Sequence, residues 1–119
     1  MKFLHDILRN RLEFKAGLNL QPKPNIDAIY KEQWNKEFET YMRNRMAQGY
    51  FRYGPLSQMI NKNLYANIDS IKERLLLYEQ THNREHLVDI ANLCLIEFTT
   101  HPNFPFRSTD DGVHVKRLK

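Results

Sequence analysis

The sequence is poor in residues that cross-link or interrupt a fold. Its 119 residues include one cysteine, four glycines and five prolines. The lone Cys94 excludes an internal disulfide and a metal site built from several cysteines, and it fits the reducing cytoplasm. So few glycines and prolines indicate that most of the chain is regular structure.

Long hydrophobic runs are also absent. No stretch approaches the roughly 18 apolar residues that a membrane span needs. The opening "MKFLHDILRNRL" is broken by His5, Asp6 and Arg9 before a signal-peptide core forms. We therefore expect a cytoplasmic protein without a membrane partner. The length predicts one domain over 1–119, with an N-terminal helix and loop (1–24), core helices (25–100) and a tail (101–119).

Acidic residues are missing from one long stretch. None occurs between Glu39 and Asp69, although that stretch holds four cations: Arg43, Arg45, Arg52 and Lys62. Clustered positive charge attracts polyanions or an acidic partner surface. A solvated basic face without a ligand is the open alternative.

The apolar residues that are present recur mostly at helical spacing. We expect helices over 2–14, from Asn25 or Asp27 to about Gly49, over 64–78, and from Asn83 to about 100. The second carries the stripe Ile29, Trp34, Phe38, Tyr41, Met42 and Met46, and Gly49 is expected to end it. In the third, Leu64, Ile68, Ile71, Leu75 and Tyr78 step by four and three, as at a helix–helix seam.

The last helix, "REHLVDIANLCLIEFTT", is apolar on nearly every face, which predicts a central position with Cys94 as a core thiol. After His101-Pro102 the chain turns polar, with Phe104 and Phe106 as anchors for the tail. The predicted fold is all-α: a compact bundle of about four helices with an irregular C-terminal tail.

Polar residues interrupt this last helix along one face. Because successive residues of a helix are rotated by about 100°, one face of this helix carries Glu85, His86, Asp89 and Asn92. They form either a polar seam that meets the arginines of the second helix or a ligand or metal site. Two carboxylates are few for magnesium, and no third zinc ligand is evident. The sequence therefore predicts no catalytic residue, and magnesium becomes relevant only for an enzyme.

The segment "RNRMAQGYFRYGPLSQ" (43–58) places arginines beside aromatic rings. Arginine near a helix C-terminus is favourable with the helix dipole, which explains Arg43 and Arg45 without a ligand. Arg52 and Tyr53 lie beyond the expected helix end. Guanidinium groups bind phosphate through paired hydrogen bonds, and tyrosine rings stack on bases. Arg45, Arg52 and Tyr53, backed by His86, Asp89 and Asn92, are the candidate ligand-binding residues.

"RMAQGYFRYG", followed by "IKERLLLYEQTHNREHLVDIANLCLIEF", resembles small helical proteins of bacteriophages and mobile elements that are similar in helix layout to the MazG-type nucleotide pyrophosphohydrolases. The likeness covers roughly 37–98. That family pairs Glu-x-x-Glu with a later Glu-x-x-Asp. Here His86-Leu-Val-Asp89 has histidine in place of the glutamate, and Glu37-Phe-Glu39 has a different spacing. The resemblance thus implies a scaffold that binds without cleaving, assembled as a homo-oligomer.

These observations together predict a phage-type accessory protein that binds a nucleotide or another phosphorylated small molecule. The resemblance adds a role in counter-defence. Two alternatives stay open: an inhibitor that binds a host defence protein through its basic aromatic surface, and an active metal-dependent nucleotide pyrophosphohydrolase.

Overall fold

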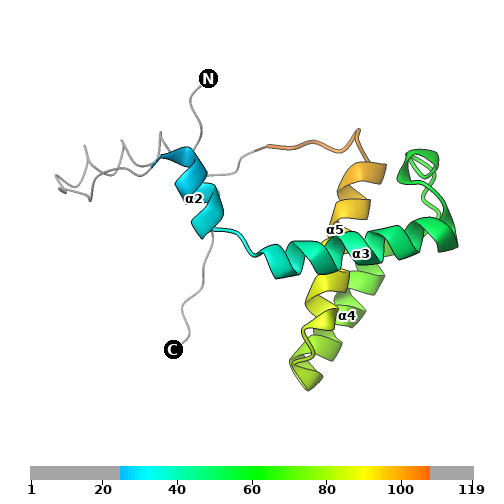
Figure 1. Cartoon of the computed structure of the whole chain (residues 1–119). Helices are drawn as coiled ribbons and strands as arrows, with labels where there is room; N and C mark the ends of the chain where they lie inside the picture. The colour runs from blue at the N-terminus through cyan, green and yellow to red at the C-terminus, as the bar shows by residue number, and fades with distance from the viewer. Residues whose placement is uncertain (1–24, 108–119) are drawn as a thin grey trace. The chain divides into compact units, whose positions relative to one another are not determined.

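The computed structural model describes residues 25–107, and these residues are all-α (Figure 1). They form α2 (Ile26–Glu32), α3 (Lys36–Tyr53), the short 3-10 helix η1 (Leu56–Gln58), α4 (Asn67–Thr81) and α5 (Glu85–Thr100). No strand occurs between residues 25 and 107, so the predicted fold class is confirmed there. The expected helix over 2–14 and the tail beyond residue 107 lie outside the described residues.

The described residues fall into two units, 25–34 with 106–107 in one and 35–105 in the other. The first contains α2, and the second contains α3, η1, α4 and α5. The candidate site belongs entirely to the second unit, which is described below by itself.

The expected second helix is in fact two helices. Asn25 caps α2, since its Oδ1 accepts a hydrogen bond from the Ala28 amide at 2.8 Å, as the sequence predicted. Asn35 then caps α3 in the same way, with its Oδ1 2.8 Å from the Phe38 amide. Asn35 has extended backbone angles, and its side chain accepts a hydrogen bond from an amide in the first turn of α3. In a continuous helix that amide would bond to a carbonyl of the preceding turn instead, so a new helix starts after Asn35.

The end of α3 corrects a second expectation. Gly49 lies inside the helix, which continues through Tyr53 and ends at Gly54. Gly54 has φ 86° and ψ −178°, a conformation that only glycine adopts readily, and its amide donates to the Tyr50 carbonyl. The residues from Tyr50 to Tyr53, expected to be irregular, are thus helical. Interior glycine costs about 1 kcal/mol, which a long helix tolerates.

Helix α5 is central in its unit, as predicted. It packs on α4, on α3 and on η1, and Figure 1 shows α3 crossing the hairpin that α4 and α5 form. The Asn83 side chain accepts a hydrogen bond from the Glu85 amide at the start of this helix. One expectation is wrong: Cys94 is exposed, because α3 and α4 contact other sides of α5.

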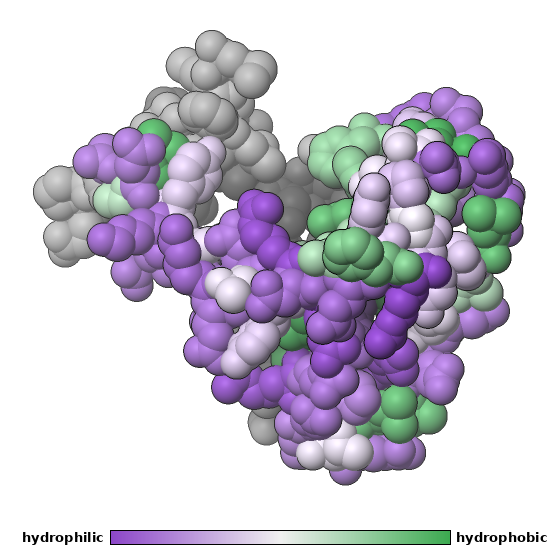
Figure 2. All heavy atoms as spheres, turned by 45° about the vertical axis from the view of Figure 1, so that its right-hand side comes forward, coloured by the Kyte–Doolittle hydropathy of each residue, from purple (hydrophilic) through white to green (hydrophobic). Residues whose placement is uncertain are grey.

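The hydrophobic core of the described residues is small. Its buried hydrophobic side chains are Met59 and Val88, at 9% and 5% exposure. Along the expected α4 seam, Ile71 and Tyr78 are half-buried, whereas Ile68 and Leu75 are 49% and 46% exposed. Apolar residues accordingly remain visible on the surface in Figure 2. The seam is therefore only partly used against α5.

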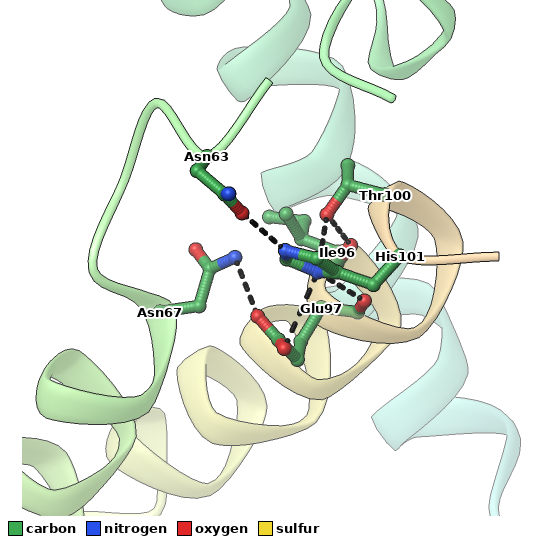
Figure 3. Close-up of polar contacts among 6 residues, drawn as sticks. All are labelled: Asn63, Asn67, Ile96, Glu97, Thr100 and His101. Carbon is green, nitrogen blue, oxygen red and sulfur yellow. Dashed lines mark hydrogen bonds and ion pairs between the residues drawn. The ribbon is translucent and has the colours of Figure 1, made fainter. Parts of the chain in front are cut away.

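A polar cluster ties the loop before α4 to the end of α5 (Figure 3). His101 Nε2 lies 2.7 Å from Asn63 Oδ1, and its Nδ1 lies 3.0 Å from the Glu97 carbonyl oxygen. The side-chain amide of Asn67 donates a hydrogen bond to Glu97 Oε1 at 3.2 Å. Phe104 stacks on the His101 ring with centroids 4.8 Å apart, so the expected aromatic anchor after α5 is present.

Candidate functional site

A cavity of about 830 Å³ lies among α3, η1, α4 and α5. A cavity of this size accommodates a ligand of nucleotide or drug dimensions. The side chains and backbone that line it include both cations and aromatic rings: Arg45, Met46, Gln48, Gly49, Tyr50, Arg52, Tyr53, Gly54, Pro55, Leu56, Ser57, Met59, Tyr65, Asn67, Ser70, Arg74, Asp89, Asn92, Leu93 and Ile96.

Three helices bring charged groups together at one side of this cavity. Arg45 of α3 lies 2.8 Å from Glu85 and 3.3 Å from Asp89, both on α5. Arg74 of α4 lies 3.4 Å from the second oxygen of Asp89. The predicted polar seam between α5 and the arginines of the expected second helix therefore exists at Arg45. Arg74 of α4 joins it, and Asp89 is its centre. Two arginines face two carboxylates, so this group is balanced in charge.

Arg52 differs from Arg45. It lies in the last turn of α3, is exposed, and lines the cavity. Among residues 25–107 it forms no ion pair. Its position near the helix C-terminus favours the cation, but the charge remains available to an anion at the mouth of the cavity.

Aromatic rings line the same cavity as Arg52. Tyr53 and Tyr65 meet edge to face with centroids 5.6 Å apart, and both line the cavity, as does Tyr50. Tyr53 comes from the end of α3 and Tyr65 from the loop that His101 and Asn63 hold in place. Two segments distant in sequence therefore form one aromatic edge.

The wall of the cavity contains a buried polar atom that has no hydrogen-bond partner among residues 25–107. Asn92 is 6% exposed, and its side-chain NH2 group donates a hydrogen bond to the Met42 carbonyl at 3.1 Å. Its Oδ1, however, accepts no hydrogen bond from residues 25–107. Arg74 Nε is also buried and forms no hydrogen bond there, but it is the atom that lies 3.4 Å from Asp89 Oδ2 in the ion pair described above. Because nearly all buried polar atoms are satisfied in folded proteins, Asn92 Oδ1 is expected to accept a hydrogen bond from water or from a bound group.

Five of the six predicted site residues line this cavity: Arg45, Arg52, Tyr53, Asp89 and Asn92. His86 does not line it, although it precedes Asp89 by one helical turn; its Nδ1 is buried and has no hydrogen-bond partner among the described residues. Sequence reasoning missed Arg74 and Tyr65. Arg74 lies within the helical seam pattern and Tyr65 in an irregular stretch, so neither carried a local signal.

The described residues contain no group of three or more histidine, cysteine, aspartate or glutamate side chains placed to hold a metal ion. Glu37 and Glu39, the carboxylates of the differently spaced motif, pair with Arg84 at 3.8 Å and with Arg43 at 3.3 Å. Within 25–107, no helix has both the length and the apolar character for crossing a bilayer.

Comparisons of the chain with models of known protein families, with curated proteins and with solved structures find no match.

Proposed function

We propose that the cavity binds a nucleotide or another phosphorylated small molecule. The observation that carries this proposal is the pairing state of the arginines: Arg45 and Arg74 are neutralised by carboxylates, while Arg52 lines the same cavity without an ion pair in the described chain. An exposed guanidinium at a cavity mouth forms charge-assisted hydrogen bonds with a phosphate.

The aromatic edge supports a flat organic group beside that phosphate. Tyr53 and Tyr65 line the same cavity as Arg52, and stacking on a tyrosine contributes about 1–3 kcal/mol per base. The Oδ1 of Asn92, which accepts no hydrogen bond from residues 25–107, adds an acceptor in the wall. A ligand with its own hydrogen-bond donor would satisfy this atom.

The phage-type, counter-defence role remains part of this proposal and rests on the resemblance over 37–98 alone. The scaffold is inferred to bind without cleaving, since the position of the family glutamate is occupied by His86.

The test is a calorimetric and thermal-shift screen of the full chain against nucleotides and inorganic phosphate, with and without magnesium. We expect at least one nucleotide to raise the melting temperature. Arg52→Ala should weaken its binding about 10- to 100-fold, as for the loss of a hydrogen-bonded charge.

Arg43→Ala is the matched control. It removes the same charge from the same helix, but Arg43 pairs with Glu39 and does not line the cavity, so the affinity should stay unchanged. Equal losses of affinity in both variants would show that the effect comes from the overall charge of the protein and not from the position of Arg52. The absence of any nucleotide or phosphate binding would favour the inhibitor alternative, and magnesium-dependent product formation would favour the enzyme alternative.

A further inference from the structure

A strip along α4 is exposed and is not used by the rest of its unit. It consists of Ile68, Lys72, Leu75 and Glu79, spaced by four and three residues, with Leu76 alongside (the α4 strip). Leu76 is 56% exposed, and Ile68 and Leu75 are about half exposed. Such spacing places the five residues on one face, as in a helix that packs against another helix.

The α4 strip carries two opposite charges, which have no ion-pair partner in the described part of the chain. Neither Lys72 nor Glu79 forms an ion pair with any residue between 25 and 107. Along the helix, Lys72 precedes the midpoint between Leu75 and Leu76 by about one turn, and Glu79 follows that midpoint by the same distance. The order along the helix is therefore cation, two leucines, anion.

We propose that the α4 strip is the contact surface for a second copy of this chain, with the two α4 helices antiparallel about a two-fold axis between Leu75 and Leu76. In that arrangement Lys72 of each copy faces Glu79 of the other, and the four leucines meet at the axis. A parallel pair would instead place lysine against lysine and glutamate against glutamate. The charge order thus selects both the partner and its direction.

The small core supplies the driving force. Because two hydrophobic side chains are buried in the described residues, the unit gains substantially from burying more apolar surface. At about 25 cal/mol per Å², each leucine removed from water adds to the stability of the assembly.

The second copy would leave the candidate site open. The α4 residues that line the cavity, Asn67, Ser70 and Arg74, lie about 140–160° around the helix from Lys72. The inference is therefore independent of the proposed ligand.

Sedimentation equilibrium and light scattering of the full chain test this surface. The wild-type chain should be a dimer that dissociates into monomers as the protein concentration is lowered. Lys72→Glu and Glu79→Lys, made singly, each replace two attractive pairs per dimer with two repulsive ones and should raise the Kd about fivefold or more. The double variant K72E/E79K recreates the pairs in reverse and should recover the wild-type Kd.

Leu76→Glu should raise the Kd at least about 100-fold, because it places two carboxylates at the axis. Phe51→Glu is the matched control, since Phe51 is 86% exposed on α3 and lies outside the α4 strip. Circular dichroism establishes that each variant keeps its helices. A wild-type chain that stays monomeric overturns the proposal, and so does a dimer that Leu76→Glu leaves intact or that the charge exchange fails to restore.

Discussion

The imidazole Nε2 of His101 lies 2.7 Å from Asn63 Oδ1 and joins the end of α5 to a loop 38 residues earlier in the chain. This loop also carries Tyr65, which meets Tyr53 at the cavity. The Asn61 amide adds a hydrogen bond to the Thr100 carbonyl at 2.8 Å. The geometry of the aromatic edge therefore depends on contacts made outside the cavity.

Asn63→Gly should lower the free energy of unfolding by about 0.5–1.5 kcal/mol more than Asn61→Gly does. Both asparagines have positive φ, 48° and 59°, so glycine fits either backbone and both changes raise the entropy of the unfolded chain alike. The difference isolates the His101 contact, and urea unfolding measures it. Equal effects would show that this contact adds nothing to stability.

Gly54→Ala should lower the free energy of unfolding by about 1–3 kcal/mol, because alanine rarely adopts φ 86° with extended ψ. Gly49→Ala is the comparison within the same helix. A Cβ at Gly49 would meet nothing within 4 Å, and alanine there should stabilise α3 by about 0.5–1 kcal/mol. Thermal unfolding of the two variants should shift in opposite directions; shifts of the same sign would contradict the assigned helix end.

Asp89→Asn should have two opposite effects. It should lower the free energy of unfolding by about 1–3 kcal/mol, since Arg45 and Arg74 share this carboxylate. It should also raise the affinity for inorganic phosphate about threefold or more, because the cavity gains one positive charge. Chemical denaturation and calorimetry give the two quantities.

Glu37→Gln is the control for Asp89→Asn. It makes the same change in net charge at the exposed Arg84 pair, outside the cavity lining. Phosphate affinity should then stay the same. An equal gain in both variants would attribute the effect to the charge of the whole molecule.

Helical spacing in the sequence was sufficient to predict the fold class and the existence of α4 and α5. It failed at boundaries decided by single residues. Asn35 begins α3 through a side-chain cap, and Gly54 ends it through an unusual backbone angle. The apolar stripe in the sequence, by contrast, continues across Trp34 without a break. Periodicity follows burial, so it does not register such local hydrogen bonding.

The candidate site was predicted where its residues share a helix face or a short segment. Asp89 and Asn92 lie on one strip of α5, and Arg52 and Tyr53 are adjacent. Arg74 and Tyr65 reach the cavity through the packing of α4 on α5, which no local pattern encodes. Likewise, the sequence did not show whether Arg45 or Arg52 would be neutralised, because that depends on distances between helices.

Asp89 serves cations on two different helices, and this sharing restricts how the sequence can vary. A change at Asp89 removes the carboxylate with which Arg74 pairs among the described residues, whereas Arg45 keeps Glu85 at 2.8 Å. Related sequences that have lost this carboxylate should therefore have changed at position 74 as well, and position 45 should follow only where Glu85 is also lost.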